Sequence, residues 1–161
     1  MRSNRYLPIK INKLTLKLSS EKYLSGNHIS DIKWEKRYEI GHDRIDFEHQ
    51  IFVNLIAKID DAVKLGNDDN YVERLLNELR VYAVFHFISE ENIMYLAGYP
   101  DYDTHKQHHD ELLANFSQKI MESQLEKHKL EALIIFLKDW FVSHTLNEDK
   151  KIASFVEGKN V

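Results

Sequence analysis

Histidines and carboxylic acids recur at helical spacing in four separate segments of this 161-residue sequence. Residues four apart lie on the same face of an α-helix, so such groups can converge on one metal ion. The first segment has one histidine, the next two have pairs four residues apart, and the last has a histidine followed by two acids. These residues are His49; His86 and Glu90; His105 and His109; and His144 with Glu148 and Asp149.

These polar residues interrupt stripes of apolar residues at spacings of three and four. His49, for example, falls in line with Ile45, Phe52 and Ile56. A buried carboxylate is unfavourable unless it is paired or bound to a metal. A lone inward histidine is more often a core residue than a ligand, and one His-x-x-x-Glu pair is a weak signal. Four helices that each offer donors to their own apolar face indicate a shared metal site.

The donor types restrict the metal. The sequence has no cysteine, which excludes thiolate sites, iron–sulfur clusters and disulfides. The pair His105 and His109 alone would also suit zinc or nickel. Five imidazoles and at least two acids exceed what a tetrahedral zinc ion uses, whereas two octahedral irons bridged by carboxylates and a solvent-derived oxygen use them all. We therefore predict a dinuclear iron site.

The apolar spacing predicts four helices, over residues 43–65, 70–97, 104–121 and from about 123 into the 150s. Asn70, Thr104 and Ser123 each precede a Glu or Gln by three residues, which is the pattern of a capping box. This pattern predicts that helices start at these three residues. The connections are therefore short, which favours antiparallel neighbours. We predict an all-α fold, an up-down-up-down antiparallel four-helix bundle over residues 34–161.

Residues 1–33 form an N-terminal extension in this division. Apolar residues from Ile9 to Leu18 alternate imperfectly with Lys, Asn and Thr, in the style of a short strand. The extension could pack on the bundle, contact a protein partner or stay loose. It carries no recognisable chemistry.

Composition excludes several classes of function. The formal net charge is -4 with both signs interspersed, which argues against nucleic acid or a membrane surface as a partner. The start of the sequence has no apolar core typical of a signal peptide, and no run is long enough to span a bilayer. We expect a soluble, cytoplasmic protein.

Taken together, the motifs resemble those of the hemerythrin family over residues 34–155. The resemblance rests on the stretch 40–46 that leads to His49, on the pairs in the second and third helices, and on the last helix. It includes Trp34, Tyr38, Ile40-Gly41-His42-Asp43-Arg44-Ile45-Asp46, His86-Phe87, Glu90, Glu91, Met94, Gly98-Tyr99-Pro100, His105, His109, Trp140, His144 and Asp149.

The resemblance implies which residues hold each iron. One iron would be held by His105, His109 and His144, and the other by His49 and His86 with a position left open. Glu90 and Asp149 would bridge the pair, together with an oxo or hydroxo group. Molecular oxygen would bind reversibly at the open position, which is binding and not enzymatic turnover.

One implied ligand conflicts with ideal helix geometry. Asp149 follows His144 by five residues, about 140° around a regular α-helix, whereas Glu148 at four residues is better aligned. The family pattern alone favours Asp149. A local bulge or a looser helix end would bring it inward.

The resemblance also implies an oxygen pocket beside the open iron. Two of its residues depart from the family, because Phe141 stands where leucine is common and Thr145 where isoleucine is common. The lining would be Phe52, Phe87, Trp140, Phe141 and Thr145.

Three functions share such a fold and site. The first is an oxygen carrier or store. The alternatives are an oxygen or redox sensor that acts through a partner, and a di-iron enzyme that handles peroxide or nitric oxide. The sequence shows no appended signalling domain and no additional inward acid–base pair, which favours the carrier.

Overall fold

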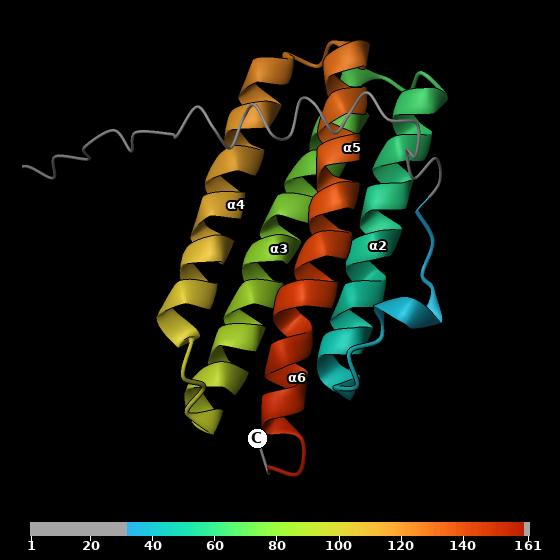
Figure 1. Ribbon diagram of the computed structural model, residues 1–161. Helices are drawn as coiled ribbons and strands as arrows, with labels where there is room; N and C mark the ends of the chain where they lie inside the picture. The colour runs from blue at the N-terminus through green and yellow to red at the C-terminus, as the bar shows by residue number, and fades with distance from the viewer. Residues whose placement is uncertain (1–31, 160–161) are drawn as a thin grey trace, which may run out of the picture.

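The computed structural model describes residues 32–159 (Figure 1). The predictions for the extension, including its strand-like pattern and its contact with a partner, fall on residues 1–31, outside the described residues. The division into an extension and a bundle at residue 33 stays a prediction.

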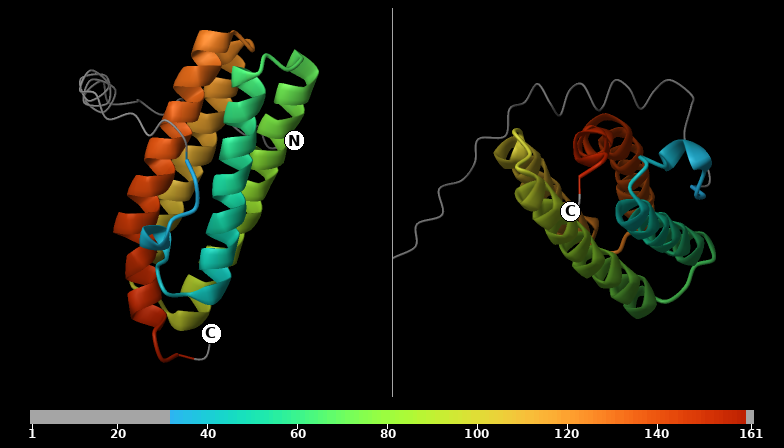
Figure 2. Two further views of the ribbon diagram at one scale, coloured as in Figure 1. Left: turned by 90° about the vertical axis from the view of Figure 1, so that its right-hand side faces the viewer. Right: turned by 90° about the horizontal axis from the view of Figure 1, so that it is seen from below.

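Four long helical rods form an antiparallel bundle (Figures 1 and 2). A short 3-10 helix, η1 (Lys36–Tyr38), precedes them. Each rod packs against two neighbours, in the order α2–α3–α4–α5 and back to α2. This arrangement confirms the predicted four-helix bundle. The rods are α2 (Asp43–Lys64), α3 (Asp69–Ala97), α4 (Tyr102–Ser123), and a last rod of α5 (Lys127–His144), the π-helical turn η2 (Thr145–Asp149) and α6 (Lys150–Val156).

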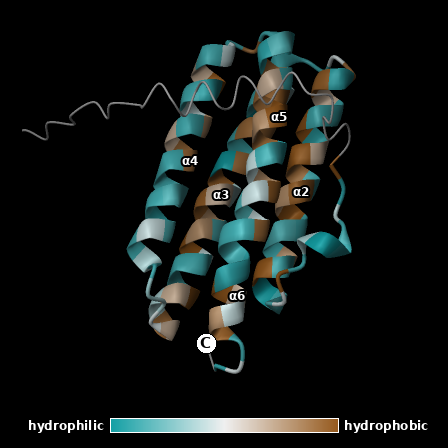
Figure 3. Cartoon of the chain, in the orientation of Figure 1, coloured by the Kyte–Doolittle hydropathy of each residue, from teal (hydrophilic) through white to brown (hydrophobic). Residues whose placement is uncertain are grey.

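The core of the bundle consists of two apolar clusters with a polar layer between them. The larger cluster includes Phe52, Phe87 and Phe141. The smaller one lies toward the start of α2 and the end of α3, and includes Ile45 and Ile93. In Figure 3, hydrophobic residues recur along α2, α3 and α5, whereas the visible side of α4 is largely hydrophilic. Apolar packing on both sides therefore fixes the level of the polar layer.

The helix starts differ from the expected ones. Asp68 caps α3 by accepting a hydrogen bond from the Tyr71 amide at 3.1 Å, so the cap is not Asn70. Thr104 lies inside α4, and Ser123 is the last residue of α4, where its hydroxyl donates to the Ile120 carbonyl. The helices start within two residues of Asn70 and Thr104, but both residues lie inside the first turn and do not cap it. Ser123 was assigned to the wrong end of a helix, because an oxygen side chain can also satisfy the groups at a C-terminus.

The π-helical turn η2 resolves the conflict over Asp149. Backbone hydrogen bonds in a π-helical turn join residues five apart, so the turn takes in an extra residue and Asp149 lies on the face that carries His144, 3.0 Å from its Nε2. Asp149 is fully buried. Glu148 instead points away from this face and pairs with Lys151 at 2.9 Å.

The described residues contain no helix that is both long enough and apolar enough to cross a bilayer.

Deleting Asn147, an exposed residue of η2, tests this view of the turn. The deletion would leave a regular α-helix with Asp149 four residues after His144. The inward residues of α5, before the deletion, and of α6, after it, would then stay on the same face. We expect the melting temperature, measured by circular dichroism, to stay within about 4 °C of the parent.

A matched control is deletion of Glu131, an exposed residue inside the regular helix α5. That deletion would turn every later residue about 100° around the axis and should unfold the bundle. If the Asn147 deletion were equally damaging, η2 would not be a simple one-residue bulge.

Candidate metal centre

All seven residues that the sequence singled out as ligands lie in the polar layer. The four long rods contribute them at one level, and each is buried, with at most 6% of its surface exposed. They are His49 on α2, His86 and Glu90 on α3, His105 and His109 on α4, His144 at the end of α5 and Asp149 at the end of η2.

Glu90 faces two sets of histidines with its two oxygens. Its Oε1 lies 3.8 Å from His49 Nε2 and 3.6 Å from His86 Nε2. Its Oε2 lies 3.2 Å from His109 Nε2 and 3.8 Å from His105 Nε2. The carboxylate therefore stands between a pair of imidazoles on one side and further imidazoles on the other.

Asp149 divides its oxygens in the same way. Its Oδ2 lies 3.2 Å from His49 Nε2. Its Oδ1 lies 3.0 Å from His144 Nε2 and 3.4 Å from His105 Nε2. The donors thus form two overlapping groups with mutual distances below 4.8 Å: His49 with His86 and Glu90, and Glu90 with His105, His109, His144 and Asp149.

The donor atoms are close together but do not satisfy one another. No hydrogen bond reaches either oxygen of Glu90 or Asp149, or Nε2 of four of the histidines, although all are buried. Buried polar atoms without partners are rare in folded proteins, and ligand atoms around a metal ion are one explanation. The convergence of unpartnered carboxylate oxygens and imidazole nitrogens fits a site for metal cations. The histidines in question are His49, His105, His109 and His144.

The charges in this layer also favour a cation. Burial and the neighbouring Asp149 oppose ionisation of Glu90, yet the surrounding histidines hold the pKa of Glu90 below its usual range. Burial likewise opposes ionisation of Asp149, but the charge of His144 keeps the pKa of Asp149 well below its usual range. Two ionised carboxylates therefore share a site that excludes water. Positive charge is needed to stabilise them.

Glu48 is a functional candidate that the sequence analysis missed. It is buried on α2, and its Oε2 accepts a hydrogen bond from His86 Nδ1 at 3.0 Å. Ser89 Oγ and Arg44 Nε donate to its Oε1 at 2.8 and 3.1 Å. These contacts fix the His86 ring with Nε2 toward the centre. The signal in the sequence was weak, because an acid beside an inward histidine looks like any acid at the edge of a helix face.

Glu91 has a similar but looser role at the other group of histidines. Its Oε1 lies 3.3 Å from His109 Nδ1, and it also pairs with Lys106 at 3.2 Å. Metal-binding histidines commonly donate their second ring N–H to a carboxylate. One histidine of each group therefore has such a support, whereas the buried Nδ1 of His49 has no partner.

The predicted pocket residues lie around the centre, but not all on one side. Phe52 and Phe141 stack at 5.8 Å between ring centres, and Phe141 meets His49 edge-on at 5.5 Å. Phe87 stacks on His109 at 4.0 Å, and Trp140 stacks on His144 at 4.9 Å. Thr145 is buried and is the first residue of η2, directly after His144 in the chain.

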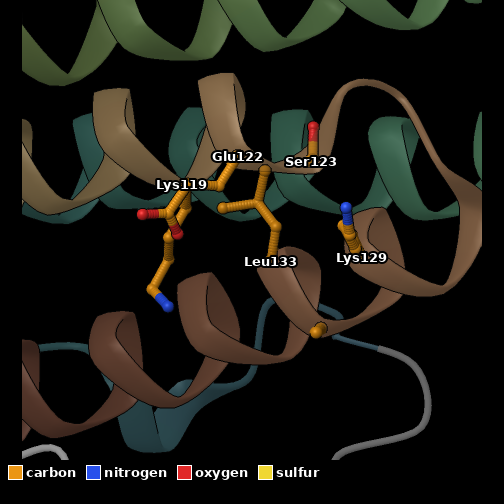
Figure 4. A pocket seen from close by; sticks show the side chains of 6 residues that line it. Lys119, Glu122, Ser123, Lys129 and Leu133 are labelled. Carbon is orange, nitrogen blue, oxygen red and sulfur yellow. The ribbon is translucent and has the colours of Figure 1, made fainter.

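Two surface pockets lie between α4 and α5, and only one is near the centre. A groove of about 510 Å³ reaches the outer edges of His144 and Trp140. A smaller pocket of about 170 Å³, shown in Figure 4, lies at the far end of the bundle near Ser123 and Leu133. The smaller pocket has no part in the metal centre.

Comparison with known proteins agrees with this geometry. Residues 40–156 match the family model for the hemerythrin HHE cation binding domain. The bacteriohemerythrin of Clostridium acetobutylicum is 28% identical over 127 residues, which cover 73% of this chain and 95% of that protein. The bacteriohemerythrin of Methylococcus capsulatus is 32% identical over 108 residues, which cover 65% of this chain and 80% of that protein.

Solved structures lead to the same family. The crystal structure of a hemerythrin mutant in which a leucine is replaced by tyrosine is similar to this chain, with a TM-score of 0.68 and 26% identity. A crystal structure of a mutant with phenylalanine in place of a leucine gives the same two values. The similarity covers 81% of this chain and all of each of those chains. With the family model matching well over half of its length, this chain belongs to the hemerythrin family.

Proposed function

We propose that this chain binds molecular oxygen reversibly at two non-haem iron ions in the polar layer, as an oxygen carrier or store. The observation that supports this most directly is the orientation of Glu90 and Asp149. Each carboxylate has one oxygen close to the first group of histidines and its other oxygen close to the second group. Oxygens that face two different groups of histidines suit two ions better than one.

The two groups differ in how many imidazoles they supply. His105, His109 and His144 would hold one iron, whereas His49 and His86 would hold the other, with Glu90 and Asp149 between them. The group with one imidazole fewer leaves room for a small ligand. When bound, the irons would supply the electrons that oxygen takes up on binding and returns on release.

Aromatic side chains would protect the side where the small ligand binds. Phe52 and Phe141 are 1% exposed and pack against His86 and His49. They exclude water from this side of the layer, which favours reversible binding over loss of charged products to solvent.

The remaining buried acids argue for binding rather than turnover. Within residues 32–159, the other buried acids are Glu48 and Asp60. Glu48 is occupied by its hydrogen bonds to His86, Ser89 and Arg44, and Asp60 by an ion pair with Lys138. Neither is available as a separate general acid or base at the centre.

Oxygen cycling tests the proposed function. The protein is loaded with ferrous iron without air, and its visible spectrum is followed through repeated changes between oxygen and argon. We expect colour that appears and disappears over many cycles. A single irreversible change with hydrogen peroxide in solution would contradict a carrier and favour a sensor or an enzyme.

The variant His86→Ala should abolish this colour and bind fewer than two irons per chain, because it removes one of only two imidazoles at its iron. His128→Ala is a matched control, since His128 is an exposed histidine on α5. Unchanged iron content in His86→Ala would refute the ligand assignment.

A second prediction concerns Glu48. Glu48→Ala should weaken binding of the iron at His49 and His86 by about 10- to 100-fold, because His86 loses the acceptor that orients its ring. Glu48→Gln, which keeps an acceptor oxygen, should retain more of the affinity. Iron content after dialysis against a chelator measures the effect.

Glu91→Ala provides the matched comparison at the other group of histidines. Its effect should be smaller, since Glu91 lies farther from His109 and is shared with Lys106. Equal losses in Glu48→Ala and Glu91→Ala would show that Glu48 has no special role in positioning His86.

A further inference from the structure

The groove between α4 and α5 reaches one ligand of the metal centre. Of the seven ligands, His144 is the most exposed, at 6% of its surface, and it lines the groove together with Trp140. On its other side, His144 Nε2 lies 3.0 Å from Asp149 Oδ1 inside the polar layer. A single imidazole ring therefore lies between the centre and the groove.

Trp140 extends this contact toward the surface. Its indole stacks on the His144 ring at 4.9 Å between ring centres, with 20° between the planes. Trp140 is partly exposed, whereas His144 is buried. The rate of electron transfer falls steeply with the distance between donor and acceptor. An electron donor in the groove would come closest to the metal ions when it lies against these two rings.

The groove lies away from the side of the centre where a small ligand would bind. It runs between α4 and α5, whereas His49 is on α2 and His86 is on α3. Neither of these two histidines lines the groove, and neither Phe52 nor Phe141 does so. This inference rests on the proposed function, in which oxygen binds beside His49 and His86. A molecule in the groove would then not compete with oxygen.

The size and lining of the groove suit a planar aromatic molecule. Its volume of about 510 Å³ lies within the range of about 300–1,000 Å³ that is usual for small-molecule sites. Leu112, Phe136 and Trp140 supply apolar surface, and the indole offers a face for stacking. Asn115 on α4 and Ser143 on α5 add exposed hydrogen-bonding groups. The ring system of a flavin has a flat aromatic face, carbonyl groups and an N–H group, and its reduced form donates electrons.

We propose that this groove is an electron-entry site, where a reduced flavin stacks on Trp140 and reduces the centre after its irons have become ferric. A ferric centre has no electrons to give to oxygen, so it must be reduced before oxygen can bind again. The flavin gives up two electrons and two protons and leaves in its oxidised form. Each of two ferric ions takes one electron, and the protons pass to solvent. Trp140 and His144 are positioning residues that keep the donor close to the ions.

Anaerobic stopped-flow reduction of the iron-loaded, ferric protein by reduced riboflavin tests the proposal. We expect a rate that saturates with riboflavin concentration, because the donor must first bind. Ser143→Phe, which places a bulky side chain in the groove, should slow reduction by about tenfold or more. Ser154→Phe is the matched control, at an exposed serine of α6 that does not line the groove, and should leave the rate unchanged.

Equilibrium dialysis of oxidised riboflavin against the iron-loaded protein gives a second readout that does not depend on electron transfer. We expect one riboflavin per chain, with weaker binding in Ser143→Phe and in Trp140→Leu. Circular dichroism and iron content verify that each variant is folded and loaded. If Trp140→Leu does not fold, Ser143→Phe alone decides the outcome.

Two results would overturn the electron-entry site. One is a parent chain that binds no riboflavin, and the other is a Ser143→Phe variant that binds riboflavin and is reduced as well as the parent. Either failure is distinct from failure of the proposed function, which would appear in the parent chain as a loss of reversible colour during oxygen cycling. Ser143→Phe itself should keep its iron and its reversible colour, because Ser143 lies outside the metal centre.

Discussion

The fold depends on one unfavourable arrangement, in which two ionised carboxylates are buried among five imidazoles, four of which have an Nε2 without a hydrogen bond. Without a cation, such a layer would oppose folding, because buried charges need close partners of opposite sign. The apolar clusters on either side hold the four rods at the level where the donors meet. The same packing that stabilises the bundle therefore brings these groups together.

Two local features make this convergence work. The π-helical turn η2 aligns Asp149 with His144, which a regular helix would not do. Glu48 reaches from α2 to His86 on α3 and joins the two helices beside the centre. The supports are unequal, since His86 has a close carboxylate partner while Nδ1 of His49 has none. His49 and His86 belong to the same group, the one with only two imidazoles, so the difference in support lies within that group.

Much of this organisation could be predicted from the sequence, because apolar spacing of three and four identifies both the helices and the faces that carry the histidines. Ideal helix geometry could not decide whether Asp149 or Glu148 points toward the metal centre, because the sequence does not show where a helix contains an extra residue. Glu48 was missed because its burial depends on contacts with another helix.

Diffraction data collected at the iron absorption edge, from crystals of the iron-loaded protein, test the central claim most directly. The account predicts two anomalous peaks in the polar layer. One would lie beside His49 and His86, the other beside His105, His109 and His144, with Glu90 and Asp149 between the two. A single peak in the layer, or iron found only at the surface of the bundle, would contradict it.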